Sequence, residues 1–75
     1  MKALLEHVVT SIVDHPESVQ IEERKEGRTI RLRLFVHPND IGKVIGKHGQ
    51  TANAIRSILS AAAPAERVRL DIIDA

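Results

Sequence analysis

The sequence contains no cysteine, tryptophan or tyrosine, and Phe35 is its one aromatic residue. The lack of cysteine excludes disulfides, thiolate nucleophiles and cysteine-based zinc sites, and it fits a reducing compartment. The near absence of aromatic rings argues against the modules that stack bases on several aromatic side chains, such as the RRM, the OB-fold and the cold-shock domain. These absences leave aliphatic packing and charge as the main chemistry of the chain.

Long apolar runs and low-complexity segments are also missing. No apolar stretch reaches the length of a signal peptide or a membrane span, so we expect a cytoplasmic protein with no membrane partner. Only four glycines and three prolines occur among 75 residues, and 43% of the residues are hydrophobic, which is a globular composition. At this length we expect one domain over residues 1–75, too small for an enzyme with a substrate domain of its own.

Acidic residues are absent from one third of the chain. Residues 41–65 contain Lys43, Lys47 and Arg56 and no aspartate or glutamate, although the whole chain has a net charge of only +1. Such a segment favours one surface that faces an anion, with ordinary solubility charges as the alternative.

The spacing of apolar residues predicts six main elements. Helical periodicity over residues 4–13 indicates a helix before Pro16, and alternation indicates strands over 18–23 and 30–36. A short helix over 41–45, with Asn39 or Asp40 as its cap, ends at Gly46. A longer helix follows Gly49 and stops at Pro64, and a last strand covers 67–72. The apolar face predicted for the longer helix consists of Ala52, Ile55, Ile58, Leu59 and Ala62.

This order, helix-strand-strand-helix-helix-strand, predicts an α+β fold of two layers. One apolar sheet face needs cover, and three amphipathic helices supply it. The hairpin makes the first two strands antiparallel, and the helical crossover is long enough for a parallel second pair. We therefore expect a three-stranded mixed sheet covered on one face by three helices.

A glycine-rich loop carries the chemistry. Gly46 and Gly49 flank Lys47 and His48 between the two predicted helices, and glycine allows positive φ and the close approach of another backbone. The second helix begins at this loop, so its unpaired N–H groups point to the same place, and Lys43 lies one turn earlier. Such a site suits a phosphodiester. The alternative is a corner that only reverses the chain.

The stretch from Ile41 to Ala52 resembles the I-G-x-x-G signature of the KH (K homology) RNA-binding domain. The helix-strand-strand opening resembles the type II, mainly bacterial, arrangement, and the chain is similar to the KhpA type of small bacterial proteins with one KH domain. The resemblance implies a groove for about four nucleotides of single-stranded RNA. It implies RNA-binding residues in the loop and beside it: Gly46, Lys47, His48, Gly49, Lys43, Ile45, Gln50, Asn53 and Arg56. It also implies a homodimer and a heterodimer with a larger KH-containing protein.

We therefore expect a non-enzymatic RNA-binding protein, a post-transcriptional regulator or RNA chaperone, that needs no cofactor. A P-loop is excluded because the motif lacks the required spacing and hydroxyl, and the four histidines show no close pair that would ligate a metal. The alternatives are a protein-interaction adaptor that works through apolar helical surfaces and, more weakly, a helix-turn-helix that reads duplex DNA.

Two further expectations concern exposed groups. Because the loop should be exposed, Gly46→Asp, or Lys47→Asp with His48→Asp, should weaken RNA binding and leave the fold intact. Self-association would use Ile41, Ile45 or Ile55 if these cannot all reach the core. The arginine pairs at 31/33 and 67/69 lie on polar strand faces, where we expect salt bridges to Glu22 or Asp71 and hold a secondary RNA surface as the alternative.

Overall fold

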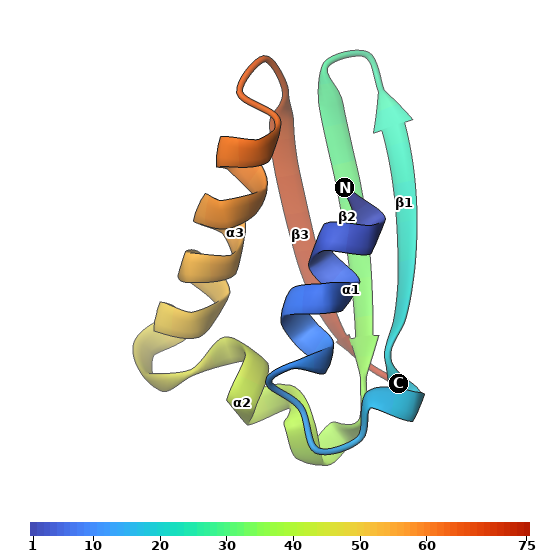
Figure 1. Cartoon of the computed structure of the whole chain (residues 1–75), viewed down its shortest axis with the longest axis vertical. Coiled ribbons are helices and arrows are strands. Elements are labelled where there is room, and N and C mark those ends of the chain that lie inside the picture. The colour runs from blue at the N-terminus through green and yellow to red at the C-terminus, as the bar shows by residue number, and fades with distance from the viewer.

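The computed structural model describes all residues, 1–75, and its elements follow the predicted order (Figure 1). The helices are α1 (Lys2–Thr10), α2 (Ile41–Ile45) and α3 (Gln50–Ala62). The strands are β1 (Gln20–Glu26), β2 (Thr29–Val36) and β3 (Arg67–Asp74). Single turns of 3-10 helix lie at η1 (Pro16–Ser18), η2 (Pro38–Asp40) and η3 (Lys47–Gly49).

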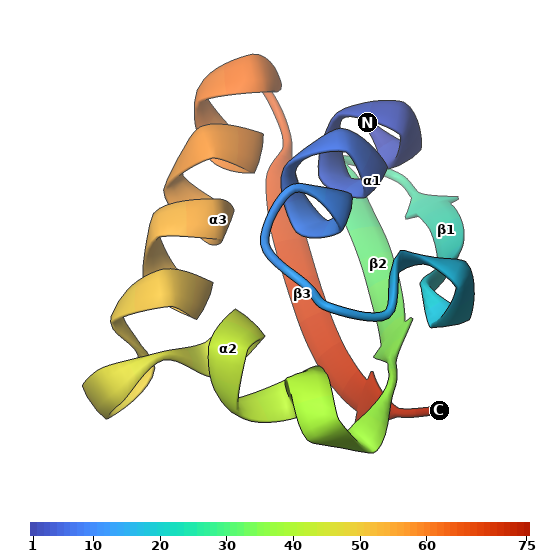
Figure 2. The ribbon, with the colours of Figure 1, turned by 60° about the horizontal axis from the view of Figure 1, so that its bottom comes forward.

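The three strands form one mixed sheet in the order β1-β2-β3. The β1–β2 pair is antiparallel and the β2–β3 pair is parallel, so β2 is central and β1 and β3 are edges. Figures 1 and 2 show α1 and α3 on the same face of the sheet, with α2 at the end of that layer. The predicted two-layer α+β fold is confirmed, with one sheet face covered by helices and the other open.

The core lies between the helices and the sheet. Strand β2 shows the clearest alternation, because every second residue from Ile30 to Val36 is buried. Twelve buried residues form one cluster: Leu5, Val9, Val13, Ile21, Ile30, Leu32, Leu34, Val36, Val44, Ile55, Leu59 and Leu70. The member from α2 is Val44, which is fully buried and anchors this short helix to the core.

Several element boundaries differ from the predictions. Strand β1 begins at Gln20 rather than at Ser18, which lies in η1, and β2 begins one residue earlier and β3 ends two residues later than predicted. Helix α1 ends at Thr10, before the predicted end of its apolar pattern. The hydroxyls of Thr10 and Ser11 donate to carbonyls one turn back, at 2.7 and 2.6 Å, and such side-chain bonds compete with helix continuation. Strand β1 continues to Glu26 although Ile21 is its one buried residue, because pairing with β2 rather than its own alternation extends it.

The longest helix, α3, has 13 residues, and no helix combines the length and apolar character that crossing a membrane requires.

Candidate nucleic-acid interface

The glycine loop joins α2 to α3 at a corner of the molecule. Helix α2 ends where the N–H of Gly46 donates to the carbonyl of Gly42 at 2.8 Å. The N–H of Gly49 then donates to the carbonyl of Gly46 at 3.1 Å, which closes a tight turn around Lys47 and His48. Both of these side chains are exposed. The turn therefore presents two basic side chains to solvent from a hydrogen-bonded backbone.

Left-handed backbone conformations give the loop its shape. Gly46 has φ 74° and ψ 173°, a region that is nearly exclusive to glycine, and Gly49 has φ 76° and ψ 13°. His48 is the one non-glycine residue with positive φ, at φ 57° and ψ 24°. Histidine is among the residues that tolerate this region best. Positive φ at three of four residues fixes the direction in which the loop amides point.

Gly46 also lies against the first turn of α3. A Cβ at this position would lie 2.3 Å from Oγ1, 2.8 Å from Cβ and 2.9 Å from the backbone nitrogen of Thr51. The expectation that Gly46→Asp leaves the fold intact is therefore wrong, because no side chain fits there without moving the start of α3. At Gly49 and Gly42, by contrast, no side chain or other segment of the protein beyond the local backbone lies within 4 Å of the position of a Cβ.

The beginning of α3 has no cap from a side chain. Gly49 occupies the N-cap position, no side chain accepts from the first-turn amides, and no acidic residue lies in that turn. The first N–H groups of a helix have no partners within the helix and concentrate its positive dipole end. The start of α3 therefore has no acidic partner and lies next to the exposed Lys47 and His48, which favours an anion there.

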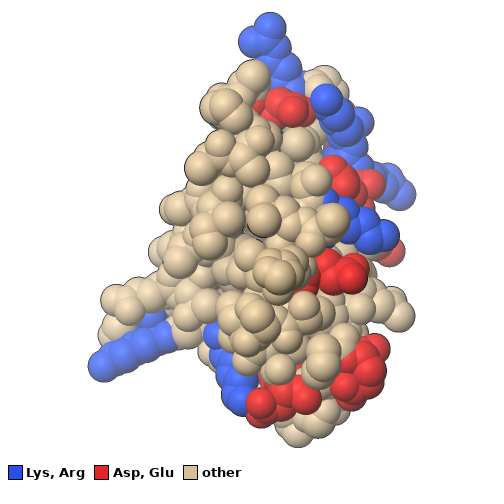
Figure 3. All heavy atoms as spheres, in the orientation of Figure 1, with Lys and Arg blue, Asp and Glu red and all other residues tan.

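Two of the predicted cations have partners within the chain. The Lys43 ammonium contacts the carboxylate of Asp14. The Arg56 guanidinium donates to the side-chain oxygen of Asn53 at 3.1 Å and to the carbonyl of Leu70 at 3.4 Å. Of the basic residues predicted for the site, the loop residues Lys47 and His48 remain without such contacts. On the helical face in Figure 3, most of the surface is uncharged, and the charged side chains gather at its edges.

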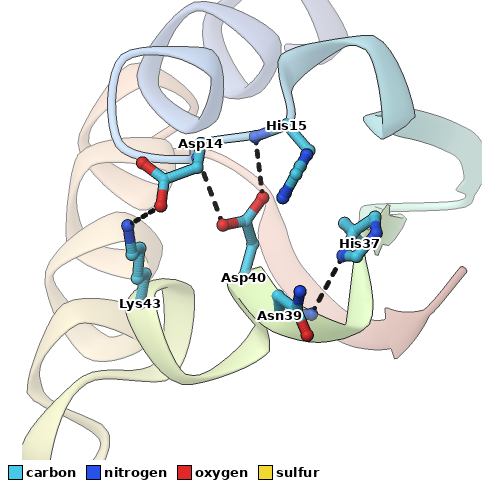
Figure 4. Close-up of polar contacts among 6 residues, drawn as sticks. All are labelled: Asp14, His15, His37, Asn39, Asp40 and Lys43. Carbon is cyan, nitrogen blue, oxygen red and sulfur yellow. Dashed lines mark hydrogen bonds and ion pairs between the residues drawn. The ribbon is translucent and has the colours of Figure 1, made fainter.

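Asp40 connects α2 to the segment after α1, a role that its place in the sequence does not predict. The residue occupies the N-cap position of α2 but does not cap it. Its fully buried carboxylate instead accepts from the backbone N–H groups of Asp14 at 3.1 Å and His15 at 3.0 Å (Figure 4). Together with the Lys43–Asp14 pair, these bonds tie the helix that precedes the loop to a segment 25 residues away. A buried carboxylate between two elements has no local sequence signal.

The electrostatics of Asp40 favour its charged form. Burial acts to raise the pKa, but the two backbone hydrogen bonds, with the nearby His15 and Lys43, outweigh it and hold the pKa below its ordinary value of 3.8.

Beside this carboxylate the rings of His15 and His37 stack, with centroids 4.1 Å apart. Nδ1 of His37 accepts from the N–H of Asn39 at 3.1 Å. The histidines are scattered in the sequence, yet the fold brings these two together. No group of three His, Asp or Glu residues is placed to hold a metal ion.

The comparisons with known proteins agree with this geometry. A family model described as KhpA/KhpB, KH domain, matches residues 2–73. A protein from Halalkalibacterium halodurans named "RNA-binding protein KhpA" is 53% identical over 76 residues, covering 99% of this chain and all of the relative. Proteins of the same name from Clostridium acetobutylicum and Bacillus subtilis are 49% and 42% identical, covering 93% and 99% of this chain and 93% and 94% of their own lengths. The chain belongs to the KhpA/KhpB family of KH domains. Its element order and mixed sheet are those of the predicted type II KH fold.

In this KH chain the predicted site residues lie in one continuous stretch, but their exposure to solvent differs. Ile45 ends α2 and is 38% exposed, and Gln50 begins α3 and is exposed. Of the isoleucines considered for self-association, Ile55 is 2% exposed and Ile41 is half-buried, so neither offers an apolar surface comparable to that of Ile45. Ile58, predicted on the buried face of α3, is 45% exposed because it lies at the side of the stripe that Leu59 occupies.

The strand arginines of the KH chain satisfy only part of the salt-bridge expectation. Arg33 pairs with Glu22 at 3.2 Å as predicted, and Arg31 pairs with Glu26 at 3.7 Å. Asp71 has no salt bridge, and Arg67 and Arg69 have no acidic partner within 4 Å. The expected pairing with Asp71 is therefore wrong.

Proposed function

We propose that this chain is a non-enzymatic protein that binds single-stranded RNA and grips its backbone with the loop from Gly46 to Gly49. The observation that carries the proposal is the conformation of this loop, which places exposed Lys47 and His48 beside the uncapped start of α3. The relatives from three bacteria carry the name "RNA-binding protein". We further propose that residues 1–75 act as one KH domain, in the cytoplasm, without a cofactor.

The chemistry of binding follows from the donors at the loop. The N–H groups of Gly46 and Gly49 donate to carbonyls of the chain, so a phosphate at the loop meets the exposed side chains of Lys47 and His48 and the start of α3. Gly49 lets the phosphate approach closely, because the place that its Cβ would take is open. The dipole of α3 adds a partial positive charge at the same point. Bases then lie over the exposed Ile45 and along the polar face of α3, where Gln50 and Asn53 offer hydrogen bonds to base edges. Aliphatic contacts suit a chain with a single aromatic ring.

The contacts of Lys43 and Arg56 indicate weak binding. With both held by partners within the chain, Lys47 and His48 are the site cations that remain to neutralise phosphates. Two neutralised phosphates correspond to a log–log salt slope of about −1.4, by the rule of about −0.7 for each phosphate of a single strand. The loop alone should therefore bind RNA weakly and with little sequence preference. Weak binding with little sequence preference fits a post-transcriptional regulator or RNA chaperone.

The experiment compares two double variants with the same change of charge. Lys47→Asp with His48→Asp places acids in the loop, and aspartate tolerates the left-handed conformation of residue 48. Lys2→Asp with His7→Asp makes the same change on the exposed side of α1. Fluorescence anisotropy with a short single-stranded RNA should show lost binding for the loop variant alone, with native circular dichroism for both. Unchanged affinity of a folded loop variant would refute the proposal.

A single replacement tests His48 separately from Lys47. His48→Asn removes the imidazole but keeps a residue that tolerates positive φ, so it should weaken binding of the short RNA if the imidazole contacts phosphate. Unchanged affinity of this variant would contradict a contact between His48 and the RNA.

A second candidate function is a protein-interaction adaptor, and two exposed isoleucines favour it. Ile45 and Ile58 are the large hydrophobic residues that α2 and α3 leave in solvent. We propose that this surface supports a homodimer or a heterodimer with a larger KH-containing protein, which would link two RNA grooves and raise their joint affinity. Sedimentation equilibrium tests self-association, since a constant mass near 8.3 kDa up to high micromolar concentration contradicts a homodimer.

A further inference from the structure

Three arginines lie in one row across the open face of the sheet. The register pairs Arg24 of β1 with Arg31 of β2, and Arg31 with Arg69 of β3. All three are exposed, and adjacent strands are about 4.8 Å apart, so the positive charges are close neighbours. Like charges directly opposite one another destabilise a sheet. The row of arginines therefore destabilises the folded sheet, and a bound ligand of negative charge would reduce this repulsion.

Carboxylates on this face compensate only part of that charge. Arg31 has a partner in Glu26 at 3.7 Å, and the next row holds Arg33 between Glu22 and Asp71. No acidic residue lies within 4 Å of the side chains of Arg24, Arg67 or Arg69. Five arginines thus face three carboxylates on the open side of the sheet, which leaves a net positive surface.

The surface is also hollowed where the row lies. A pocket on the open face is lined by six charged residues and no hydrophobic one: Glu22, Arg24, Glu26, Arg31, Arg33 and Asp71. A hollow without apolar lining does not suit an apolar segment of another protein. Its three arginines and three carboxylates balance, so the excess positive charge of this face comes from Arg67 and Arg69 on β3.

The row continues toward the candidate RNA site around the β3 edge. Strand β3 is an edge of the sheet, and α3 lies beside it (Figure 2). From α3, the Arg56 guanidinium reaches the carbonyl of Leu70 at 3.4 Å, and Leu70 directly follows Arg69. A line of arginines therefore runs from α3 over the edge of the sheet to Arg69, Arg31 and Arg24.

We propose that the row of Arg24, Arg31 and Arg69 binds the phosphodiester backbone of RNA that extends beyond the loop. This inference rests on the proposed function, since it assigns the open sheet face to the same single strand. A short RNA occupies the groove alone, whereas a longer strand passes around β3 and meets the row. Arginine suits this role, because its planar guanidinium donates to phosphate oxygens in pairs.

The test uses the full chain and two RNA lengths. Arg24→Gln with Arg69→Gln removes two charges of the row, and Glu22→Gln with Arg33→Gln removes an ion pair from the same face without changing its net charge. Binding is measured against salt with single strands of about four and about 24 nucleotides, the shorter being the length that one groove holds. The row variant should flatten the salt slope for the long RNA by about 1.4, about 0.7 for each lost phosphate contact, and leave the short RNA unaffected. The control variant should bind both as the unaltered chain does.

The outcomes separate this inference from the proposed function. An unchanged salt slope of the row variant on the long RNA overturns the inference, whatever the loop variant does. Lost binding of the row variant to polyglutamate, with RNA binding unchanged, also overturns it and assigns the face to an acidic protein. Unchanged binding of the loop variant to the short RNA contradicts the proposed function alone. Thermal melting adds a further check, because removing like charges from a row with no structural role should leave stability equal or higher.

Discussion

Alanine substitutions at the three glycines of the signature should have effects of different sign and size on stability. At Gly46 the backbone lies at φ 74° and ψ 173°, where a residue with a Cβ costs about 1–3 kcal/mol. The new Cβ also overlaps Thr51, at 2.3 Å from Oγ1 and 2.9 Å from the backbone nitrogen. Such overpacking costs a further 1–3 kcal/mol or so. We therefore expect Gly46→Ala to lower the free energy of unfolding by about 2–6 kcal/mol.

The other two glycines provide matched controls within the same motif. Gly49 has a left-handed backbone and open space around it, so Gly49→Ala should cost only the conformational penalty of about 1–2 kcal/mol. Gly42 lies in helix α2, also with open space, so Gly42→Ala should stabilise the chain by about 0.4–1 kcal/mol. From most to least stable, the expected order is thus Gly42→Ala, the unaltered chain, Gly49→Ala and Gly46→Ala.

Urea unfolding followed by circular dichroism measures all three differences. A chain of 75 residues has a total stability of roughly 4–11 kcal/mol, so Gly46→Ala should unfold at markedly lower urea or be unfolded without it. Thr51→Ala removes the closest of the overlapping atoms, so Gly46→Ala should cost less in that background, by about 1 kcal/mol. A Gly46→Ala variant that is no less stable than Gly49→Ala would refute the overlap with Thr51.

Other predictions concern a buried carboxylate and one face of α3. Because folding lowers the pKa of Asp40 below 3.8, its contribution to stability is present above that pH and is lost as the pH falls through the folded value. Asp40→Asn should therefore melt at lower temperature at neutral pH, and the difference should narrow below about pH 4 in thermal melts; a difference independent of pH contradicts this. Leu59→Ala should cost about 2–5 kcal/mol, because Leu59 is fully buried. Ile58→Ala should stay within about 1 kcal/mol in the same urea titration, and equal losses for the two would contradict the burial pattern of α3.

The periodicity of the sequence predicts most of the fold, because each half-buried element repeats its apolar residues at its own spacing. Strand β2 is the clearest case, with the buried residues where alternation puts them. The prediction is less accurate where neighbours decide the outcome. Strand β1 extends to Glu26 because β2 supplies partners, and α1 stops at Thr10 because hydroxyls compete for its carbonyls. Neither the strand pairing nor the hydroxyl hydrogen bonds can be recognised from the spacing of apolar residues.

In the candidate site, too, local features can be predicted from the sequence, whereas features that depend on distant segments cannot. A local motif predicts the loop, and glycine chemistry accounts for its left-handed turns. The partners of the surrounding charges come from distant segments, so spacing along the chain does not show that Asp14 holds Lys43 or that Asp40 accepts from the segment after α1. The row of arginines across the sheet likewise depends on the register of three strands.

The parallel pairing of β2 and β3 determines when the loop can acquire its shape during folding. The antiparallel hairpin of β1 and β2 closes through a short turn, but β2 and β3 meet only after the chain from Val36 to Arg67 has crossed over the sheet. Closing the longer connection costs more chain entropy and is slower. The α2-loop-α3 segment lies entirely inside that crossover. During synthesis β3 emerges after the loop, so we expect a nascent chain that holds only the hairpin to have no RNA site.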